Sequence, residues 1–280
     1  MGSTQQSYLI VGAGVFGAST ALYLRQSDPS AIVTLLDQTS FPNPSVASHD
    51  LNKIIRADYD DIFYMKLALE AQRLWRSDPI YKPYYRESGM LFAEDMGMCR
   101  KCVENYKALG EESVAEMITP EEARARFSEF KDAEWTDVKE SYYNPRSGWG
   151  EAEPALRSVI QAAVDHGVIY IAATVLTLSI NQIGTCTGVQ TEDGRDLTAD
   201  HIILCTGPRT AKLLADSAPN NKELQVDGRM VAAAAAVSCT VRVAPKQMDR
   251  FRHVPVFANL MDHTHGSSSH VLQFKTLILI

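Results

Sequence analysis

Three glycines and one aspartate near the N-terminus have the spacing of a nucleotide-binding turn. Gly12, Gly14 and Gly17 follow the apolar run of residues 8–11 in a G-x-G-x-x-G pattern, and Asp37 lies 20 residues after Gly17. In such a turn the first glycine permits a sharp bend, the second lets a pyrophosphate approach the backbone, and the third lets a helix pack closely. A carboxylate at the position of Asp37 can accept hydrogen bonds from ribose hydroxyls.

The elements that must position these residues are a strand, a helix and a second strand. Residues 8–11 predict the first strand, residues 18–25 the helix, and residues 31–36 a strand that ends on Asp37. The helix N-terminus offers free N–H groups and a partial positive charge to phosphates. These features predict an adenine dinucleotide, FAD or NAD, because the acid would repel the 2′-phosphate of NADP. A glycine-rich turn without a ligand would not account for Asp37.

Length, composition and charge place further limits on function. The 280 residues suffice for one large domain or two ordinary ones, and 45% hydrophobic with 22% charged residues is typical of a globular protein. The net charge of −7 disfavours nucleic acid or an anionic membrane as a partner. No apolar run approaches the roughly 20 residues of a membrane span, and no secretory signal is evident. We therefore expect an intracellular protein, cytoplasmic or peroxisomal, and not a secreted one.

The cysteines favour the same compartment. Five are scattered through the chain without regular spacing, which suits a reducing environment. Cys99 and Cys102 form a C-x-x-C pair, but no second pair or histidine cluster accompanies it. This pattern favours two helical thiols over a zinc or redox site.

A second candidate segment lies shortly after the turn. Residues 49–56 contain three apolar side chains and five polar or ionisable ones: His49, Asp50, Asn52, Lys53 and Arg56. The apolar residues anchor the segment in packing, and it is close in sequence to the phosphate turn. We therefore interpret it as part of a site, with a solvated loop as the alternative.

The rest of the chain predicts alternating helices and strands. The helices are expected at residues 61–75, 100–109, 154–166 and 245–251, with a capped helix beginning at Thr119, and the strands at 89–93, 168–178, 199–206, 231–243 and 253–260, with a hairpin around 193–194. Gly207 directly follows the strand at 199–206 and precedes a helix through residue 214. This second glycine turn can approach the cofactor from the other side.

Four segments give the chain a resemblance to a known family. They are residues 11–17 (VGAGVFG), 48–56 (SHDLNKIIR), 204–207 (LCTG), and 242–245 (RVAP) with 254–256 (VPV). With these, the chain resembles the flavin-dependent secondary-amine oxidases, which include monomeric sarcosine oxidase, pipecolate oxidase and the fungal fructosyl-amino-acid oxidases or amadoriases. The resemblance covers about residues 8–260, its most specific segment is 48–56, and it looks closest to the amadoriase-like branch.

The resemblance implies an α/β fold like that of D-amino-acid oxidase. A Rossmann-type FAD-binding domain would comprise residues 1–85 and 150–225, and a mixed α+β substrate domain residues 86–149 and 226–280. We expect a monomer. Family members are longer, so the chain is expected to end inside the substrate domain, and residues 266–280 match no family segment. None of the five cysteines stands where many members bind FAD covalently.

The resemblance also implies the chemistry. FAD, rather than NAD, would accept hydride equivalents from a secondary amine, such as an N-substituted amino acid of the sarcosine, pipecolate or fructosyl-amino-acid kind. The amine becomes an imine, and molecular oxygen is reduced to hydrogen peroxide. Two alternatives stay open: a nicotinamide-dependent dehydrogenase that uses the same opening turn, and an inactive, truncated flavoprotein.

By position, the resemblance assigns site residues along the chain. The candidates for cofactor binding are Gly12, Ala13, Gly14, Val15, Phe16, Gly17, Asp37, Gln38, Ser48, His49, Asp50, Lys53, Val175 and Gly207. Of these, Val15 and Phe16 would approach the pyrophosphate, and Val175 the adenine side. Ser48, His49 and Asp50 would line the flavin.

The candidates for catalysis are Lys53, Arg56 and His49. Lys53 would stand beside the isoalloxazine, where positive charge stabilises reduced flavin and developing superoxide. Arg56 would bind a substrate carboxylate, and since many amadoriases lack an arginine there, it favours a small N-substituted amino acid over a glycated one. The alternative for Arg56 is an ion pair with one of the acids at positions 58, 60 and 61.

Overall fold

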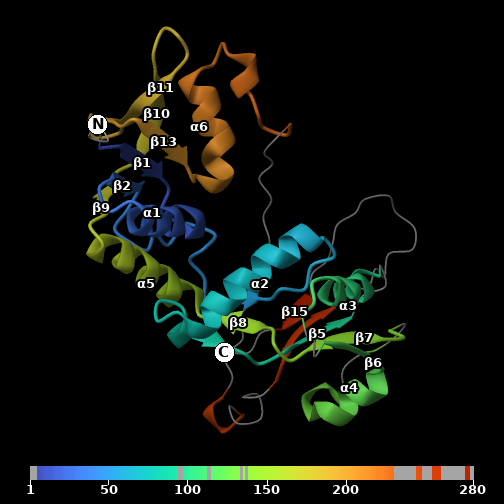
Figure 1. Ribbon diagram of the computed structural model, residues 1–280. Helices are drawn as coiled ribbons and strands as arrows, with labels where there is room; N and C mark the ends of the chain where they lie inside the picture. Colours follow the sequence, from blue (N-terminus) through green and yellow to red (C-terminus); the bar gives the residue numbers. More distant parts are fainter. Residues whose placement is uncertain are drawn as a thin grey trace. The chain divides into compact units, whose positions relative to one another are not determined.

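The computed structural model describes residues 5–93, 97–111, 115–132, 135, 138–229, 244–247, 254–259 and 275–277. The chain forms two compact units, each built from two stretches of sequence (Figure 1). Unit 1 comprises Met1–Leu51 and Glu151–Val237, and unit 2 comprises Asn52–Gly150 and Ser238–Ile280. Residues 52–85, which the sequence analysis groups with the FAD-binding domain, lie in unit 2, because their strand and helix pack with elements of that unit.

Unit 1 is built on a four-stranded parallel sheet with the order β13-β1-β2-β9. Its strands are β1 (Ser7–Val11), β2 (Ile32–Asp37), β9 (Ile169–Ala172) and β13 (His201–Leu204). All three pairings are parallel, so the carboxyl ends of the four strands lie at one edge of the sheet. In open parallel sheets, ligands bind at this edge.

Two helices of unit 1 pack against each other, α1 (Val15–Ser27) and α5 (Ala152–Asp165) (Figure 1). The buried face of α1 consists of small or apolar residues, Gly17, Ala18, Ala21 and Leu22. The helix begins at Val15, three residues before the predicted start, because it follows its N-cap Gly14 directly. The predicted end of α5 before Gly167 is confirmed, and Gly167 has a φ of +90°, which favours glycine.

A second, antiparallel sheet completes unit 1. It consists of β10 (Val175–Ile180), β11 (Cys186–Thr191) and β12 (Asp196–Thr198), and α6 (Thr210–Ser217) packs against β10. The single strand predicted over residues 168–178 is two strands. Residues 173 and 174 cross between the sheets. The N–H of Ala173 donates to the backbone carbonyl oxygen of Asp37 in β2, and the backbone carbonyl oxygen of Thr174 accepts from the N–H of Glu192. Two 3-10 helices, η3 (Gly207–Arg209) and η4 (Lys222–Leu224), flank α6.

Unit 2 contains a five-stranded mixed sheet with the order β15-β14-β5-β7-β6 and a small sheet with the order β3-β8-β4. The large sheet has β5 (Met90–Ala93), β6 (Glu116–Ile118), β7 (Ser141–Asn144), β14 (Val256–Asn259) and β15 (Lys275–Leu277). The small sheet has β3 (Lys53–Ile55), β4 (Tyr85–Arg86) and β8 (Gly148–Gly150).

The helices of unit 2 are α2 (Ile62–Ser77), α3 (Met98–Ala108) and α4 (Pro120–Arg126), with the 3-10 helices η1 (Lys82–Tyr84), η2 (Ser128–Phe130) and η5 (Pro245–Gln247). A core of Met65, Met90, Phe92, Cys99, Cys102, Tyr106 and Tyr142 joins α2 and α3 to the large sheet. The predicted start of α4 is confirmed: Thr119 and Glu122 form a capping box.

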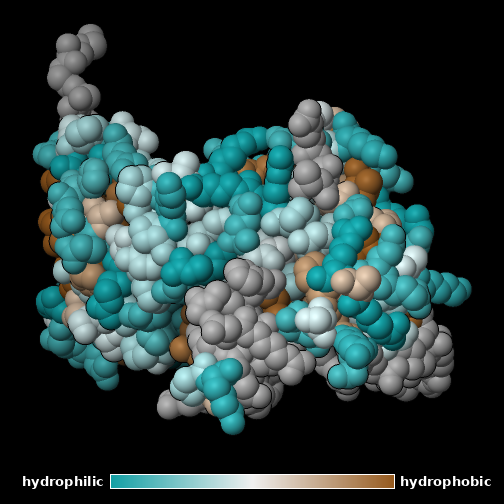
Figure 2. Space-filling view, turned by 90° about the horizontal axis from the view of Figure 1, so that it is seen from below, coloured by the Kyte–Doolittle hydropathy of each residue, from teal (hydrophilic) through white to brown (hydrophobic). Residues whose placement is uncertain are grey.

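Some predictions lie wholly or partly outside the described residues. The strand predicted at 231–243 lies outside them, and of the helix predicted at 245–251 only η5 is described. The strand predicted at 253–260 is seen as β14. Among the described residues no helix is long and apolar enough to cross a membrane. On the face drawn in Figure 2 the described surface is mostly hydrophilic, with hydrophobic residues in separate patches.

Candidate functional site

The glycine turn lies between the carboxyl ends of β2 and β13. The N–H of Gly12 donates to the carbonyl oxygen of Leu36 at 2.7 Å. The N–H of Cys205 donates to the carbonyl oxygen of Val11, also at 2.7 Å. Gly12 has a φ of +103°, and a Cβ there would lie 2.3 Å from the carbonyl oxygen of Cys205. The first glycine is therefore required by the backbone conformation and by the close approach of the neighbouring strand.

The other two glycines differ in what surrounds them. A Cβ on Gly17 would lie 1.8 Å from the carbonyl oxygen of Gly12, so the close contact of α1 is with the turn itself. A Cβ on Gly14 would meet only the Oγ of Ser48, at 3.3 Å. Gly14 is thus the position where the protein's own packing leaves room beside the backbone, and this room suits a closely approaching phosphate.

The N-terminus of α1 carries the amides expected to meet the pyrophosphate. The N–H of Val15 donates to the Oγ of Ser48 at 2.9 Å, which brings Ser48 onto the turn. Within the described part of the chain, no group accepts from the N–H of Phe16 or Gly17. The side chains of Val15 and Phe16 are 53% and 78% exposed. The helix end therefore presents two N–H groups for an anion.

Asp37 is used by the protein itself. Its side chain is only 5% exposed, and Oδ2 accepts from the N–H of Ala13 at 2.6 Å. Oδ1 accepts from the N–H of Gln38 at 2.7 Å and from Nδ2 of Asn43 at 2.5 Å. The acid thus ties the end of β2 to the turn. The amide of Asn43 is a partner that the sequence analysis missed, because a side chain in a loop has no periodic signal.

The remaining candidates of unit 1 lie in loops or at element ends. His49 donates its N–H to Val46, and the carbonyl oxygen of Asp50 accepts from Glu153 at the start of α5. Gly207 begins η3 with a φ of +55°, two residues after Cys205, so the second glycine turn lies beside the first. Val175 begins β10, after the crossing from β9.

Lys53 and Arg56 lie in unit 2. Lys53 begins β3 opposite Gly150 of β8, and Arg56 follows directly after the strand. The guanidinium of Arg56 lies over the ring of Tyr59, at 4.5 Å from its centroid, and at 5.9 Å from that of Phe92. Its Nη1 donates to the backbone carbonyl oxygen of Asp58.

The structure does not show an ion pair between Arg56 and any of the acids at positions 58, 60 and 61. Among the described residues, Arg56 forms no ion pair, and its contact with Asp58 is to the backbone and not to the carboxylate. The carboxylate of Asp61 instead caps α2, accepting from the N–H of Phe63 at 2.7 Å. The acids that follow Arg56 therefore leave its charge without a carboxylate.

The C-x-x-C pair is buried in α3. The side chains of Cys99 and Cys102 are both buried in the hydrophobic core of unit 2. No group of three or more histidine, cysteine, aspartate or glutamate side chains in the described residues could hold a metal ion. The prediction that both cysteines lie in a helix is confirmed by α3.

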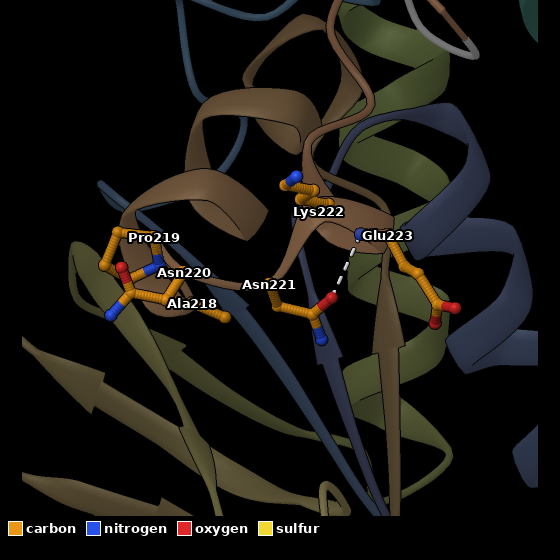
Figure 3. Close-up of a pocket in the computed structure, with 6 residues that line it drawn as sticks. All are labelled: Ala218, Pro219, Asn220, Asn221, Lys222 and Glu223. Atoms are coloured by element: carbon orange, nitrogen blue, oxygen red, sulfur yellow. Dashed lines mark hydrogen bonds between the residues drawn. The ribbon is translucent and has the colours of Figure 1, made fainter.

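One surface pocket is formed by Ala218, Pro219, Asn220, Asn221, Lys222 and Glu223 (Figure 3). These residues are consecutive, and the Oδ1 of Asn221 accepts from the N–H of Glu223 at 3.0 Å as the cap of η4. Ligand sites usually collect polar groups from several elements. We therefore interpret this pocket as a turn between α6 and η4.

A parallel sheet with a glycine turn, a helix N-terminus and an acid at its carboxyl edge defines a dinucleotide-binding protein of the Rossmann type. The sequence matches the family described as FAD dependent oxidoreductase (DAO) over residues 7–271, and the chain belongs to that family. The predicted fold class and the predicted cofactor of the family, FAD rather than NAD, are thereby confirmed.

Several relatives support this assignment. L-saccharopine oxidase of Schizosaccharomyces pombe is 30% identical in an alignment of 219 residues that covers 72% of this chain and 51% of that protein. Amino acid oxidase imqH of Aspergillus flavus is 29% identical in an alignment of 259 residues that covers 75% of this chain and 53% of that protein. The chain spans about half the length of these curated relatives.

Solved structures agree on the fold. A modified fructosyl peptide oxidase from Aspergillus nidulans superposes with a TM-score of 0.74 at 22% identity, over 91% of this chain and 60% of that one. Amadoriase I from Aspergillus fumigatus gives a TM-score of 0.68 at 21% identity, over 93% of this chain and 59% of that one. The predicted resemblance to amine and amino acid oxidases is confirmed at the level of family and fold.

Proposed function

We propose that the protein takes part in the FAD-dependent oxidation of a secondary amine that carries a carboxylate, such as an N-substituted amino acid. The observation that carries this proposal is the guanidinium of Arg56, which is stacked on Tyr59 and, among the described residues, pairs with no acid. It stands three residues after Lys53 in the most specific segment of the chain. A cationic side chain suits a site for an anionic substrate, and a second one suits a site for an electron-rich cofactor.

The groups of unit 1 fit the adenine dinucleotide part of FAD. The N–H groups of Phe16 and Gly17 would bind the pyrophosphate, which the open space beside Gly14 admits. A carboxylate has about four acceptor positions, of which Asp37 uses three, so one is left for a ribose hydroxyl. Ser48, His49 and Asp50 would follow the cofactor toward the flavin, Gly207 would approach it from β13, and Val175 would lie on the adenine side.

The reaction is a two-electron oxidation. A hydride leaves the carbon next to the amine nitrogen and the nitrogen loses a proton, which gives the imine. When bound, FAD would supply the two-electron acceptor, and molecular oxygen would take up the two electrons and two protons as hydrogen peroxide. Lys53 would hold positive charge near the site where negative charge develops, and His49 is the further candidate for moving a proton.

Arg56 would select the substrate. A guanidinium binds a carboxylate through two parallel, charge-assisted hydrogen bonds, each worth on the order of 1.5–3 kcal/mol in a partly dehydrated site. Losing this pair would weaken substrate binding roughly tenfold or more. The relative from S. pombe is named L-saccharopine oxidase, which supports an N-substituted amino acid as the substrate class.

The test compares amines that differ only in the carboxylate. Hydrogen peroxide release by the FAD-loaded protein is measured with sarcosine against dimethylamine and with pipecolate against piperidine, and L-saccharopine serves as a third acid. We expect preference for the acids in the wild type and loss of that preference in Arg56→Ala. If Arg56→Ala lowers activity on the acid and on the amine equally, or leaves both activities unchanged, Arg56 does not bind the substrate carboxylate. Release of no peroxide with any of these amines would contradict the proposed activity.

Other parts of the expectation also stand as proposals. We assign the cofactor chiefly to unit 1 and the substrate chiefly to unit 2. We further propose that the protein is monomeric and intracellular. Size-exclusion chromatography with light scattering and imaging of the tagged protein in cells test these two statements.

A further inference from the structure

A buried carboxylate lies close to Arg56 in sequence, and none of the cationic side chains in the described chain pairs with it. The side chain of Asp58 is 1% exposed and accepts four hydrogen bonds. They come from the hydroxyls of Tyr106, at 3.1 Å, and Tyr142, from Nδ2 of Asn144, at 2.7 Å, and from the hydroxyl of Ser147, at 2.6 Å. No lysine, arginine or histidine of the described chain forms an ion pair with it.

These donors are held in their protonated form. Burial first, and the charge of Asp58 second, raise the pKa of Tyr106 and of Tyr142 far above the ordinary tyrosine value. Both hydroxyls therefore donate at any physiological pH. A carboxylate that is buried without water or a cation is costly unless it is fully hydrogen-bonded, and here the four donors replace the lost water.

The donors come from elements far apart in the sequence. Tyr106 lies in α3, Tyr142 and Asn144 in β7, and Ser147 in the turn between β7 and β8. Asn105, next to Tyr106, donates from Nδ2 to the carbonyl oxygens of residues 59 and 60, at 3.1 and 2.7 Å. The short loop between β3 and α2 is thus fixed at three consecutive residues by side chains outside it.

This loop is also what orients Arg56. The backbone carbonyl oxygen of Asp58 accepts from Nη1 of Arg56, and the ring of Tyr59 lies under the guanidinium. The carboxylate of Asp58 points to the tyrosines, whereas its carbonyl oxygen meets the arginine. One residue therefore links the buried hydrogen-bond network to the position of the cationic group.

We propose that Asp58 is a positioning residue that sets the orientation of the Arg56 guanidinium and thereby the selectivity for carboxylate-bearing amines. The inference rests on the proposed function, since it requires Arg56 to bind the substrate carboxylate.

The test is a double-mutant cycle in the FAD-loaded protein with Asp58→Asn, Arg56→Ala and the double variant. The pairs sarcosine and dimethylamine, and pipecolate and piperidine, are the probes. In Asp58→Asn we expect KM for the acid to rise about tenfold while kcat, and both constants for the neutral amine, change less than about twofold. In the Arg56→Ala background, Asp58→Asn should change the acid-to-amine ratio no further.

The outcomes separate the inference from the proposed function. If Arg56→Ala leaves the acid-to-amine ratio unchanged, the proposed role of Arg56 fails. If Arg56→Ala changes the ratio but Asp58→Asn lowers activity on acid and amine in parallel, the positioning role alone is overturned, and Asp58 serves only the fold.

A milder pair of variants keeps the test valid if Asp58→Asn does not fold. Ser147→Ala removes the hydrogen bond from the Ser147 hydroxyl to Oδ2 of Asp58 and leaves the charge of Asp58. Ser141→Ala is the matched control, because its Oγ is buried in β7 and has no hydrogen-bond partner among the described residues. We expect KM for the acid to rise about threefold in Ser147→Ala and to stay unchanged in Ser141→Ala. Equal effects of the two variants would overturn the inference.

Discussion

The carboxylate of Asp37 accepts a hydrogen bond of 2.6 Å from the backbone N–H of Ala13. Ala13 lies between the first two glycines of the turn, so the acid at the end of β2 holds the loop that is proposed to receive the pyrophosphate. The same carboxylate orders Gln38 and Asn43. An acid usually explained by its contact with ribose is here first a structural part of the turn.

The first prediction concerns Asp37→Asn. Hydrogen bonds to a charged acceptor are worth about 1.5–3 kcal/mol, so the apoprotein should lose free energy of unfolding of about that size. Flavin retention should fall as well. Asp196→Asn, on exposed β12, is the control and should change neither quantity. The measurements are chemical denaturation of the apoprotein and flavin absorbance after gel filtration. Loss of flavin at unchanged stability would contradict the structural role.

The second prediction separates the glycines. Gly14→Val should give a folded protein that does not retain flavin, because Gly14 has an ordinary extended backbone and its new Cβ would meet only Ser48. Gly17→Ala should fail to fold, since its Cβ would lie 1.8 Å from a backbone oxygen. Circular dichroism and flavin absorbance distinguish these results.

A double variant identifies why Gly14→Val does not retain flavin. Combining Gly14→Val with Ser48→Gly removes the side chain that the valine would meet. If the valine excludes the pyrophosphate, the double variant still lacks flavin. Recovery of flavin would mean that displacement of Ser48 was responsible.

The third prediction concerns Lys53→Met, which keeps the length of the side chain and removes its charge. If Lys53 supports the reaction with oxygen, stopped-flow absorbance should show a larger fall in the rate of reoxidation than in the rate of anaerobic reduction by substrate. Lys66→Met, on exposed α2, is the control for loss of a positive charge. Unchanged reoxidation in Lys53→Met would restrict Lys53 to a structural role.

The fourth prediction concerns acid stability. Hydrogen bonds from the hydroxyl and then from the backbone N–H of Ser7 hold the pKa of Asp200 below its ordinary value of 3.8. A carboxylate with a lowered native pKa stabilises the fold above that ordinary value, and the stabilisation is lost as pH falls through the native pKa. Asp200→Asn should therefore lower the unfolding temperature near neutral pH.

That difference should shrink in acid. As pH falls below 3.8 and through the lowered native pKa, the unfolding temperatures of wild type and Asp200→Asn should converge, because the carboxyl of Asp200 then becomes protonated in the folded protein too. In a Ser7→Ala background, Asp200→Asn should lower the unfolding temperature at neutral pH much less than it does in the wild type. A difference that is constant from pH 7 to strong acid would show that Asp200 acts through something other than its charge.

The sequence predicted unit 1 well where the signals are local. The strand, turn, helix and second strand around Gly12 and Asp37 follow from periodicity and from residues less than 30 positions apart. The capping box of Thr119 and Glu122 is also a local pattern, spanning four residues. In each case the residues that determine the structure are neighbours in sequence, so the pattern carries the information.

The network around Asp58 could not be predicted in this way. Its four donors are separated from Asp58 by 48, 84, 86 and 89 positions. From the sequence, Asp58 was only one of three acids that could have paired with Arg56. The burial of Asp58 and the direction of its carboxylate, away from Arg56, follow from the packing of α3 and β7. No local pattern in residues 53–61 predicts that packing.

The fixed loop after β3 has a consequence for the entropy of binding. An arginine side chain loses up to about 1.5–2 kcal/mol of rotamer freedom when it is immobilised. Here the ring of Tyr59 and the carbonyl oxygen of Asp58 restrain the guanidinium of Arg56 through contacts within the chain. Much of that entropy is lost when the chain folds, so a carboxylate arriving at Arg56 would not have to order it.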